Sequence, residues 1–333
     1  MTSQTTRIET FLQPLHWAGA DSRPLAGDAS ARRYDRLFRG AETAVLMIAP
    51  PGEEMHRFRR VDDWLRAQGF SAPRILGFDA DAGLMLLEDF GDDQLARLLR
   101  QNPEAEAAHY AAITEFLLEL HRQPPPDFVL RLDGPGLAAL LDLMAEWYPS
   151  RDRAAAQEIG PLVAALHDRL EPLPPVLSLR DFHAENVIWL PDRAGSARLG
   201  LLDFQDAVVC HPAYDLVSAL QDARRDLDPA VQAREIAHYA TARGIEHGSF
   251  ATAVALLGAQ RALRILGIFV RLCLAQGKPQ YVDLIPRVWR NLLGNLRAPG
   301  LEDLRRVCES ALCPPDDALL ERMRQECGQH PMR

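Results

Sequence analysis

The chain has 333 residues, of which 47% are hydrophobic and 25% charged, as is ordinary for a folded enzyme of about two domains. The formal net charge of −9, from 37 basic and 46 acidic residues, argues against non-specific binding to nucleic acid or to an anionic membrane. The sequence predicts no signal peptide, and its most apolar segment, residues 251–275, is interrupted by arginines and makes a poor membrane span.

The five cysteines do not form a recognisable pattern. Their spacing fits no zinc-binding template, and an odd number fits no closed disulfide framework. We therefore expect free thiols and a location in the reducing cytoplasm. Nothing in the sequence points to an obligate protein partner.

The first part of the chain alternates between strand and helix patterns. Short runs rich in β-branched and aromatic residues are separated by glycine turns, and one amphipathic segment ends at Gly69. These patterns predict two strand pairs around one helix: strands 34–39 and 43–49, helix 53–68, and strands 75–78 and 84–87.

Beyond residue 90 helical periodicity predominates, apart from one strand-rich patch over residues 187–190 and 198–202. The predicted helices cover residues 102–121, 135–147, 153–171, 214–225, 229–243, 249–276 and 280–296. We predict an α+β, two-lobed fold. Its small N-terminal sheet lobe spans residues 1–90, and its larger, mainly helical C-terminal lobe spans residues 91–333.

Two short segments carry the residues that phosphoryl transfer requires. Asp181 is followed five positions later by Asn186, and Asp203 ends the apolar run 199–202 after a predicted hairpin. A carboxylate can orient the acceptor hydroxyl and take its proton, and oxygen ligands hold the magnesium that bridges ATP phosphates. We predict Asp181 as the base and Asn186 and Asp203 as magnesium ligands; a polar loop with a capping aspartate is the simpler interpretation of either segment alone.

These segments, R-D-F-H-A-E-N over residues 180–186 and L-L-D-F-Q-D over 201–206, resemble the aminoglycoside phosphotransferase family. Residues 117–124 and 212–216 resemble two further motifs of that family. The resemblance implies a two-lobed, protein-kinase-like fold with ATP and Mg²⁺ as cofactors. It also implies that Asp215 braces the catalytic loop.

Several segments resemble a subgroup of bacterial cell-wall-sugar kinases more closely, among them G-D-A-S-A-R-R-Y over residues 27–34 and I-L-G-I-F-V-R-L over 265–272. That subgroup phosphorylates the anomeric hydroxyl of N-acetylmuramate and N-acetylglucosamine. The resemblance therefore implies a small-molecule sugar substrate and a role in cell-wall recycling. An aminoglycoside or other hydroxyl kinase, with acids of residues 298–333 in its acceptor site, and a catalytically silent nucleotide-binding module are the alternatives.

The nucleotide-binding lobe departs from the kinase pattern, because Met47 stands where kinases place a phosphate-contacting lysine and Lys278 is the only lysine in the chain. We expect Arg32 or Arg33 to substitute for it, although both also suit a solvated strand. Backbone N–H groups can cradle phosphate as well. The resemblance implies that a second segment pairs with adenine through its backbone, leaving two carboxylates to cap the next helix. The residues concerned are Gly27, Asp28, Ala29 and Ser30 for phosphate, and Glu88, Asp89 and Phe90 for adenine.

Candidates for the acceptor site lie on the catalytic loop and on the long apolar helix. His183 either contacts the sugar or braces the loop, and Glu185 lies beside it. Asp206 touches metal or substrate, or makes a local structural contact. The arginines of the helix lie on one side of it and need partners, which are either a substrate carboxylate or internal aspartates: Arg261, Arg264 and Arg271.

Overall fold

The computed structural model describes residues 4–25 and 32–330 and divides the chain into two compact units. The first unit comprises residues 1–106 and 184–207, and the second comprises residues 107–183 and 208–333. The lobe boundary predicted after residue 90 is thus not where these units divide. The structure places residues 91–106 and the segment 184–207 with the N-terminal sheet.

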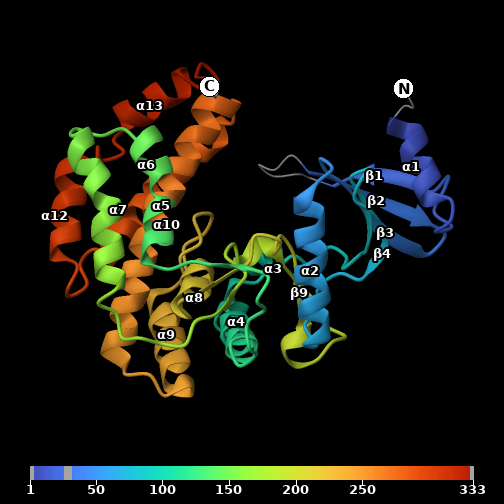
Figure 1. Cartoon of the computed structure of the whole chain (residues 1–333), viewed down its shortest axis with the longest axis horizontal. Coiled ribbons are helices and arrows are strands. Elements are labelled where there is room, and N and C mark those ends of the chain that lie inside the picture. The colour runs from blue at the N-terminus through green and yellow to red at the C-terminus, as the bar shows by residue number, and fades with distance from the viewer. Residues whose placement is uncertain (1–3, 26–31, 331–333) are drawn as a thin grey trace. The chain divides into compact units, whose positions relative to one another are not determined.

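A five-stranded antiparallel sheet forms the framework of the first unit (Figure 1). Its strand order is β1-β2-β3-β5-β4, with β1 Asp21–Pro24, β2 Arg33–Arg39, β3 Glu42–Ile48, β4 Ile75–Asp79 and β5 Leu84–Glu88. Both predicted strand pairs are confirmed. Gly40 adopts a left-handed φ of 60° at the β2–β3 turn, a conformation that glycine reaches without steric cost.

Helices cover the sheet of the first unit. α1 (Gln4–Leu12) packs Leu12 onto the sheet face that carries Leu37 and Leu46, in one hydrophobic cluster. Figure 1 shows α2 (Glu53–Ala67) on the other side of the sheet. The buried residues of α2 follow the helical period that the sequence predicts: Met55, Phe58, Val61 and Leu65.

A short hairpin returns to the first unit from the middle of the chain. β8 (Val187–Trp189) pairs with β9 (Leu199–Leu201), as predicted, and a bridge joins Ser71 to Gly200 of β9. The Trp189 N–H donates to the Asp93 carbonyl at 2.7 Å. Strand β9 therefore ends next to residues of the N-terminal sheet unit, and Asp203 follows directly.

The second unit is mainly helical and is organised around α10 (His247–Gln276), a 30-residue helix. Its other helices are α4 (Glu106–Leu120), α5 (Gly134–Ala139), α6 (Asp142–Trp147), α7 (Arg153–His167), α8 (Ala213–Leu220), α9 (Pro229–Arg243), α11 (Ile285–Asn295), α12 (Glu302–Ala311) and α13 (Asp317–Gln325). Three short strands complete it: β6 (Leu130–Arg131), β7 (Val176–Ser178) and β10 (Val208–Cys210). The predicted α+β class is confirmed.

Helix α10 is long and apolar enough to cross a membrane by composition, but 83% of its most hydrophobic window is buried inside the protein. It contacts α6, α8 and α11 (Figure 1). A Cβ on Gly267 would lie 2.6 Å from the Met144 backbone, so α6 packs directly against α10 at a position without a side chain. The helix is thus the core of the second unit.

Three predictions about the helices were wrong in detail. The helix predicted over residues 135–147 is two helices, α5 and α6, and the one over 280–296 is a 3-10 turn, Pro279–Leu284, followed by α11. Residues 298–333 were given no helix, yet α12 and α13 lie there. For α13 the sequence did hold a capping residue, since the Asp316 side chain accepts from the Leu319 N–H at 2.8 Å.

Asp62 of α2 is a carboxylate within the interior of the first unit. Its exposed fraction is 0%, and neither carboxylate oxygen has a hydrogen-bond partner in the described part of the chain. Burial raises the pKa of Asp62 to about 7, against the attraction of Arg66. Because this pKa lies above the ordinary value, the folded protein loses stability as pH rises from about 4 to about 7.

We expect Asp62→Asn to raise the free energy of unfolding at pH ~8 by on the order of 3 kcal/mol, because the variant buries no charge. The gain should shrink as pH falls toward ~4, where Asp62 is already protonated in the folded state. Urea unfolding at several pH values measures this. The control Asp303→Asn removes an exposed carboxylate of α12 and should show no such trend. Equal stability of Asp62→Asn and wild type at the higher pH contradicts the prediction.

Candidate active site

The segment before Asp181 is held by a buried carboxylate of the second unit. Asp215, in the first turn of α8, accepts hydrogen bonds from the Ser178 hydroxyl at 2.6 Å, the Leu179 N–H at 2.6 Å and the Arg180 N–H at 2.9 Å. Arg180 adopts a left-handed φ of 72°, which is rare for a residue with a side chain. The bracing role that the resemblance implied for Asp215 is confirmed by these contacts.

The ionisation of Asp215 depends on the same contacts. Burial raises its pKa to about 6, while the Ser178 hydroxyl, the two backbone N–H groups and Arg261 act in the opposite direction. The carboxylate is therefore ionised at neutral pH and can accept all three hydrogen bonds.

Asp181 is half-buried and lies among positive charges of the second unit. Burial alone would raise its pKa, but Arg264, Arg261, His183 and Arg180, in that order, hold the pKa below its ordinary value. Asp181 is therefore an anion at neutral pH. An ionised carboxylate at this position can accept a hydrogen bond from an acceptor hydroxyl and orient it.

The arginines of α10 have different environments. Arg261 is 6% exposed and donates to the Arg180 carbonyl and the Ser218 hydroxyl, both at 2.7 Å, with its guanidinium 5.0 Å from the centre of the Tyr214 ring. Its hydrogen bonds thus go to a carbonyl and a hydroxyl and not to aspartates, the partners that the simpler interpretation expected. Arg264 is half-buried and exerts the strongest attraction on Asp181, and a contact of Arg264 or Arg271 with the acceptor stays a prediction.

His183 lies two residues after Asp181 and is half-buried. Burial lowers its pKa, against the attraction of Asp222 and Asp181. A neutral imidazole is therefore present at physiological pH. The preceding ring, Phe182, stacks on Phe116 of α4 with centroids 5.1 Å apart. The loop is packed on this side, and a contact of His183 with the acceptor stays a prediction.

The two predicted metal ligands come together in the first unit. Asn186 ends a 3-10 turn, Ala184–Asn186, and its carbonyl accepts from the Leu202 N–H at 3.0 Å, next to Asp203. Asp203 has a left-handed φ of 56° directly after β9. Its Oδ1 accepts from Gln205 at 3.0 Å. Asp203 thus has a backbone conformation that is rare for a residue with a side chain.

This arrangement fits a magnesium ion delivered with ATP. The described residues contain no cluster of three or more His, Cys, Asp or Glu that could hold a metal by itself. Mg²⁺ is usually bound through one or two carboxylates, waters and substrate phosphates, so a complete protein cage is not needed. The Asp203 side chain is 39% exposed, which leaves it accessible.

The two candidate phosphate-binding arginines differ in exposure and in partner. The Arg32 side chain is 9% exposed and its Nη2 lies 2.7 Å from Asp203 Oδ1. Arg33 is 55% exposed and pairs with Asp35 of the same strand. Met47 is 1% exposed, so it is part of the core. The predicted phosphate-binding residues Gly27, Asp28, Ala29 and Ser30 lie outside the residues that the structure describes.

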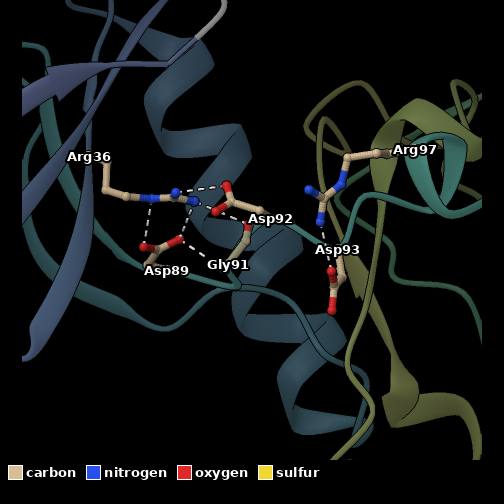
Figure 2. Close-up of polar contacts among 6 residues, drawn as sticks. All are labelled: Arg36, Asp89, Gly91, Asp92, Asp93 and Arg97. Atoms are coloured by element: carbon tan, nitrogen blue, oxygen red, sulfur yellow. Dashed lines mark hydrogen bonds and ion pairs between the residues drawn. The ribbon is translucent and has the colours of Figure 1, made fainter. Parts of the chain in front are cut away.

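The carboxylates of the predicted adenine segment bind arginines and do not cap a helix. Arg36 lies between Asp89 and Asp92, with its Nε 2.8 Å from Asp89 Oδ2 and its Nη1 2.8 Å from Asp92 Oδ1 (Figure 2). Glu88 Oε1 lies 2.7 Å from Arg193 Nη2. The expected capping is wrong, because α3 (Leu95–Gln101) begins after Gln94 and has no side-chain cap.

Phe90 has a packing role in the same segment. The Arg193 guanidinium lies 5.2 Å from the centre of its ring. A Cβ on Gly200 would approach the ring to 2.8 Å, so the absence of a side chain in β9 lets the phenyl group lie against the strand. Backbone pairing of residues 88–90 with adenine stays a prediction.

Two further acceptor candidates make local contacts within the first unit. The Glu185 carboxylate lies 3.3 Å from Arg100, and its carbonyl accepts from Gln94 at 2.7 Å. Asp206 lies 3.8 Å from Arg57, and both side chains are partly exposed. The local contact that was the alternative for Asp206 is therefore present, and substrate contacts of both residues stay predictions.

Sequence reasoning missed Glu54, which lies 3.3 Å from Arg32 Nε. Glu54 is in the first turn of α2, where an acidic residue is favoured by the helix dipole alone. No signal in the sequence connected it with Arg32. Arg36 and Arg193, which hold Asp89 and Glu88, were missed for the same reason.

Comparison with known proteins agrees with this geometry. The family model described as the phosphotransferase enzyme family, APH, matches residues 21–250. An N-acetylmuramate/N-acetylglucosamine kinase of Caulobacter vibrioides is 39% identical, covering 89% of this chain and 93% of the relative. A kinase of the same name from Pseudomonas putida is 31% identical, covering 84% and 85%.

Solved structures show the same fold at lower identity. A choline/ethanolamine kinase family protein from Mesorhizobium loti matches with a TM-score of 0.62 and 17% identity, over 92% of this chain and 99% of that one. An aminoglycoside phosphotransferase from Streptomyces rimosus, solved with ADP and streptomycin, matches with a TM-score of 0.51 and 18% identity, over 77% and 99%. From its family match and its similarity to these relatives, the chain belongs to the aminoglycoside phosphotransferase (APH) family of phosphotransferase enzymes.

Proposed function

We propose that the protein is an ATP-dependent kinase that transfers the γ-phosphoryl group to the anomeric hydroxyl of N-acetylmuramate and N-acetylglucosamine. The observation that carries the acceptor class is the 39% identity to a kinase named for these two sugars, over most of both chains. The observation that carries the chemistry is a half-buried, ionised Asp181 on a braced segment. We place the reaction in the cytoplasm, which five free cysteines favour.

The proposed chemistry depends mainly on positioning and charge. Asp181 accepts the hydrogen bond of the acceptor hydroxyl and takes its proton as the oxygen attacks the terminal phosphorus of ATP. Asn186 and Asp203 hold Mg²⁺, which would neutralise charge on the phosphates. Asp215 and Arg261 do not touch substrate; they fix the backbone on which Asp181 lies.

A low pKa for Asp181 makes it a weak base, and this fits an anomeric acceptor. The anomeric hydroxyl is the most acidic hydroxyl of a free sugar, because the ring oxygen withdraws electron density. It therefore demands less of its base than an ordinary alcohol does. The fold similarity to aminoglycoside phosphotransferases is below 20% identity and does not favour a cationic antibiotic as acceptor. The presence of Asp181, Asn186 and Asp203 counts against a catalytically silent module.

We expect Asp181→Asn to lower turnover by ~10²–10⁴-fold, because the amide cannot take the proton. Nucleotide affinity and thermal stability should stay near wild type, since the shape of the side chain is kept. Coupled ADP-release kinetics and a melting curve measure the two properties. Turnover within a few-fold of wild type would remove Asp181 from the mechanism.

The pH dependence of turnover tests the charge environment of Asp181. Arg264 is the first of the charges that hold its pKa down, so Arg264→Gln should raise that pKa and move the acidic limb of the kcat profile to higher pH. The control is Arg306→Gln, an exposed arginine of α12 paired with Asp303, which should leave the limb in place. An unmoved limb in Arg264→Gln contradicts the assignment.

The position of phosphorylation is tested with blocked sugars. Methyl glycosides of both N-acetyl sugars lack the free hydroxyl at the anomeric carbon, and we expect no turnover with them. Phosphorus NMR of the product from the free sugars should show phosphate on that carbon. Equal rates on the methyl glycosides would overturn the anomeric assignment and leave the kinase assignment standing.

A further inference from the structure

Arg32 occupies a position in the first unit where two carboxylates from different elements meet. Its Nη2 lies 2.7 Å from Asp203 Oδ1, beyond β9, and its Nε lies 3.3 Å from Glu54 Oε1, in the first turn of α2. Its Nη1 donates to the Tyr34 hydroxyl at 3.4 Å. These contacts tie the start of β2 to a helix and to the candidate metal site.

Arg32 is more deeply buried than the two carboxylates that it contacts. Its side chain is 9% exposed, while the carboxylates of Glu54 and Asp203 are 42% and 39% exposed. Burying a guanidinium is costly, and the two acids offset that cost. Both acids also keep an accessible side toward solvent, so a ligand of Asp203 would arrive next to the guanidinium.

The proposed reaction needs a positive charge at the nucleotide phosphates, and no lysine of the first unit can supply it. The only lysine, Lys278, belongs to the second unit, and Met47 is buried in the core. Asp203 would hold the magnesium that accompanies the nucleotide phosphates, and the Arg32 guanidinium lies 2.7 Å from the same carboxylate. Guanidinium groups bind phosphate oxygens with paired, charge-assisted hydrogen bonds.

We propose that Arg32, positioned by Glu54, is the cation that contacts the nucleotide phosphates of this enzyme. The cation thus comes from the start of β2 and not from β3, where kinases of this fold class carry a lysine. Glu54 is a positioning residue, because it holds the Nε side of the guanidinium. The inference deepens the proposed function and rests on its ATP dependence, but not on the identity of the sugar.

The test is equilibrium binding in the absence of sugar, with two probes: a non-hydrolysable ATP analogue with Mg²⁺, and adenosine. Arg32→Ala should weaken binding of the analogue by roughly tenfold to a hundredfold, the scale of one charge-assisted contact, and leave adenosine affinity unchanged. Glu54→Gln should show a smaller loss in the same direction, and Glu54→Asp should restore part of it. Arg60→Ala, an exposed arginine of α2 paired with Glu53, is the matched control and should bind both probes like wild type.

Two results overturn the inference. One is Arg32→Ala binding the ATP analogue as tightly as wild type. The other is an equal loss of analogue and adenosine affinity, which would mark Arg32 as structural. If Arg32→Ala fails to fold, Arg32→Gln gives the same comparison, since it removes the positive charge and keeps a longer polar side chain. Wild type that binds nucleotide but phosphorylates neither sugar overturns the proposed acceptor and leaves Arg32 in its role.

Discussion

The active segment depends on one buried interaction, the three hydrogen bonds that Asp215 accepts from Ser178, Leu179 and Arg180. Arg180 has a left-handed backbone that costs on the order of 1 kcal/mol or more, so it needs to be held. Arg261 contributes from the opposite side by donating to the Arg180 carbonyl. The Asp215 carboxylate therefore binds the N–H of Arg180, and the Arg261 guanidinium binds its carbonyl. The next residue, Asp181, is the proposed base.

The arginines of this chain have different roles, which can be told apart by the groups that each guanidinium contacts. Arg261 donates to a backbone carbonyl and a hydroxyl, Arg36 pairs with Asp89 and Asp92, and Arg32 joins Glu54 to Asp203. Each is at least partly buried, and each is used where a flexible lysine would hold its partner at a single point. The near absence of lysine from the sequence is therefore compatible with a complete set of charged contacts.

Much of the fold and the enzyme family could be predicted from the sequence, because the signals for both are local, whereas the roles of the site residues stay predictions. Strand alternation and glycine turns identified β2 through β5, and the order of Asp181, Asn186 and Asp203 identified the chemistry. The sequence did not predict that residues 135–147 form two helices, α5 and α6. Their arrangement involves tertiary contacts, such as that of the Met144 backbone with Gly267 of α10. The partner of Arg32 could not be read either, since the Glu54 contact joins residues whose proximity only the folded sheet and helix create.

Helix α10 shows how strictly one element can constrain change in a family of enzymes. Gly258 leaves room for the Gln221–Asn295 amide pair, Arg261 reaches the catalytic segment, and Gly267 admits the α6 backbone, all from one continuous helix. Inserting a single residue between these positions would rotate everything beyond it by ~100°, since a turn takes 3.6 residues. Length variation among relatives should therefore fall at the ends of this helix, and specificity should diverge by substitution along it.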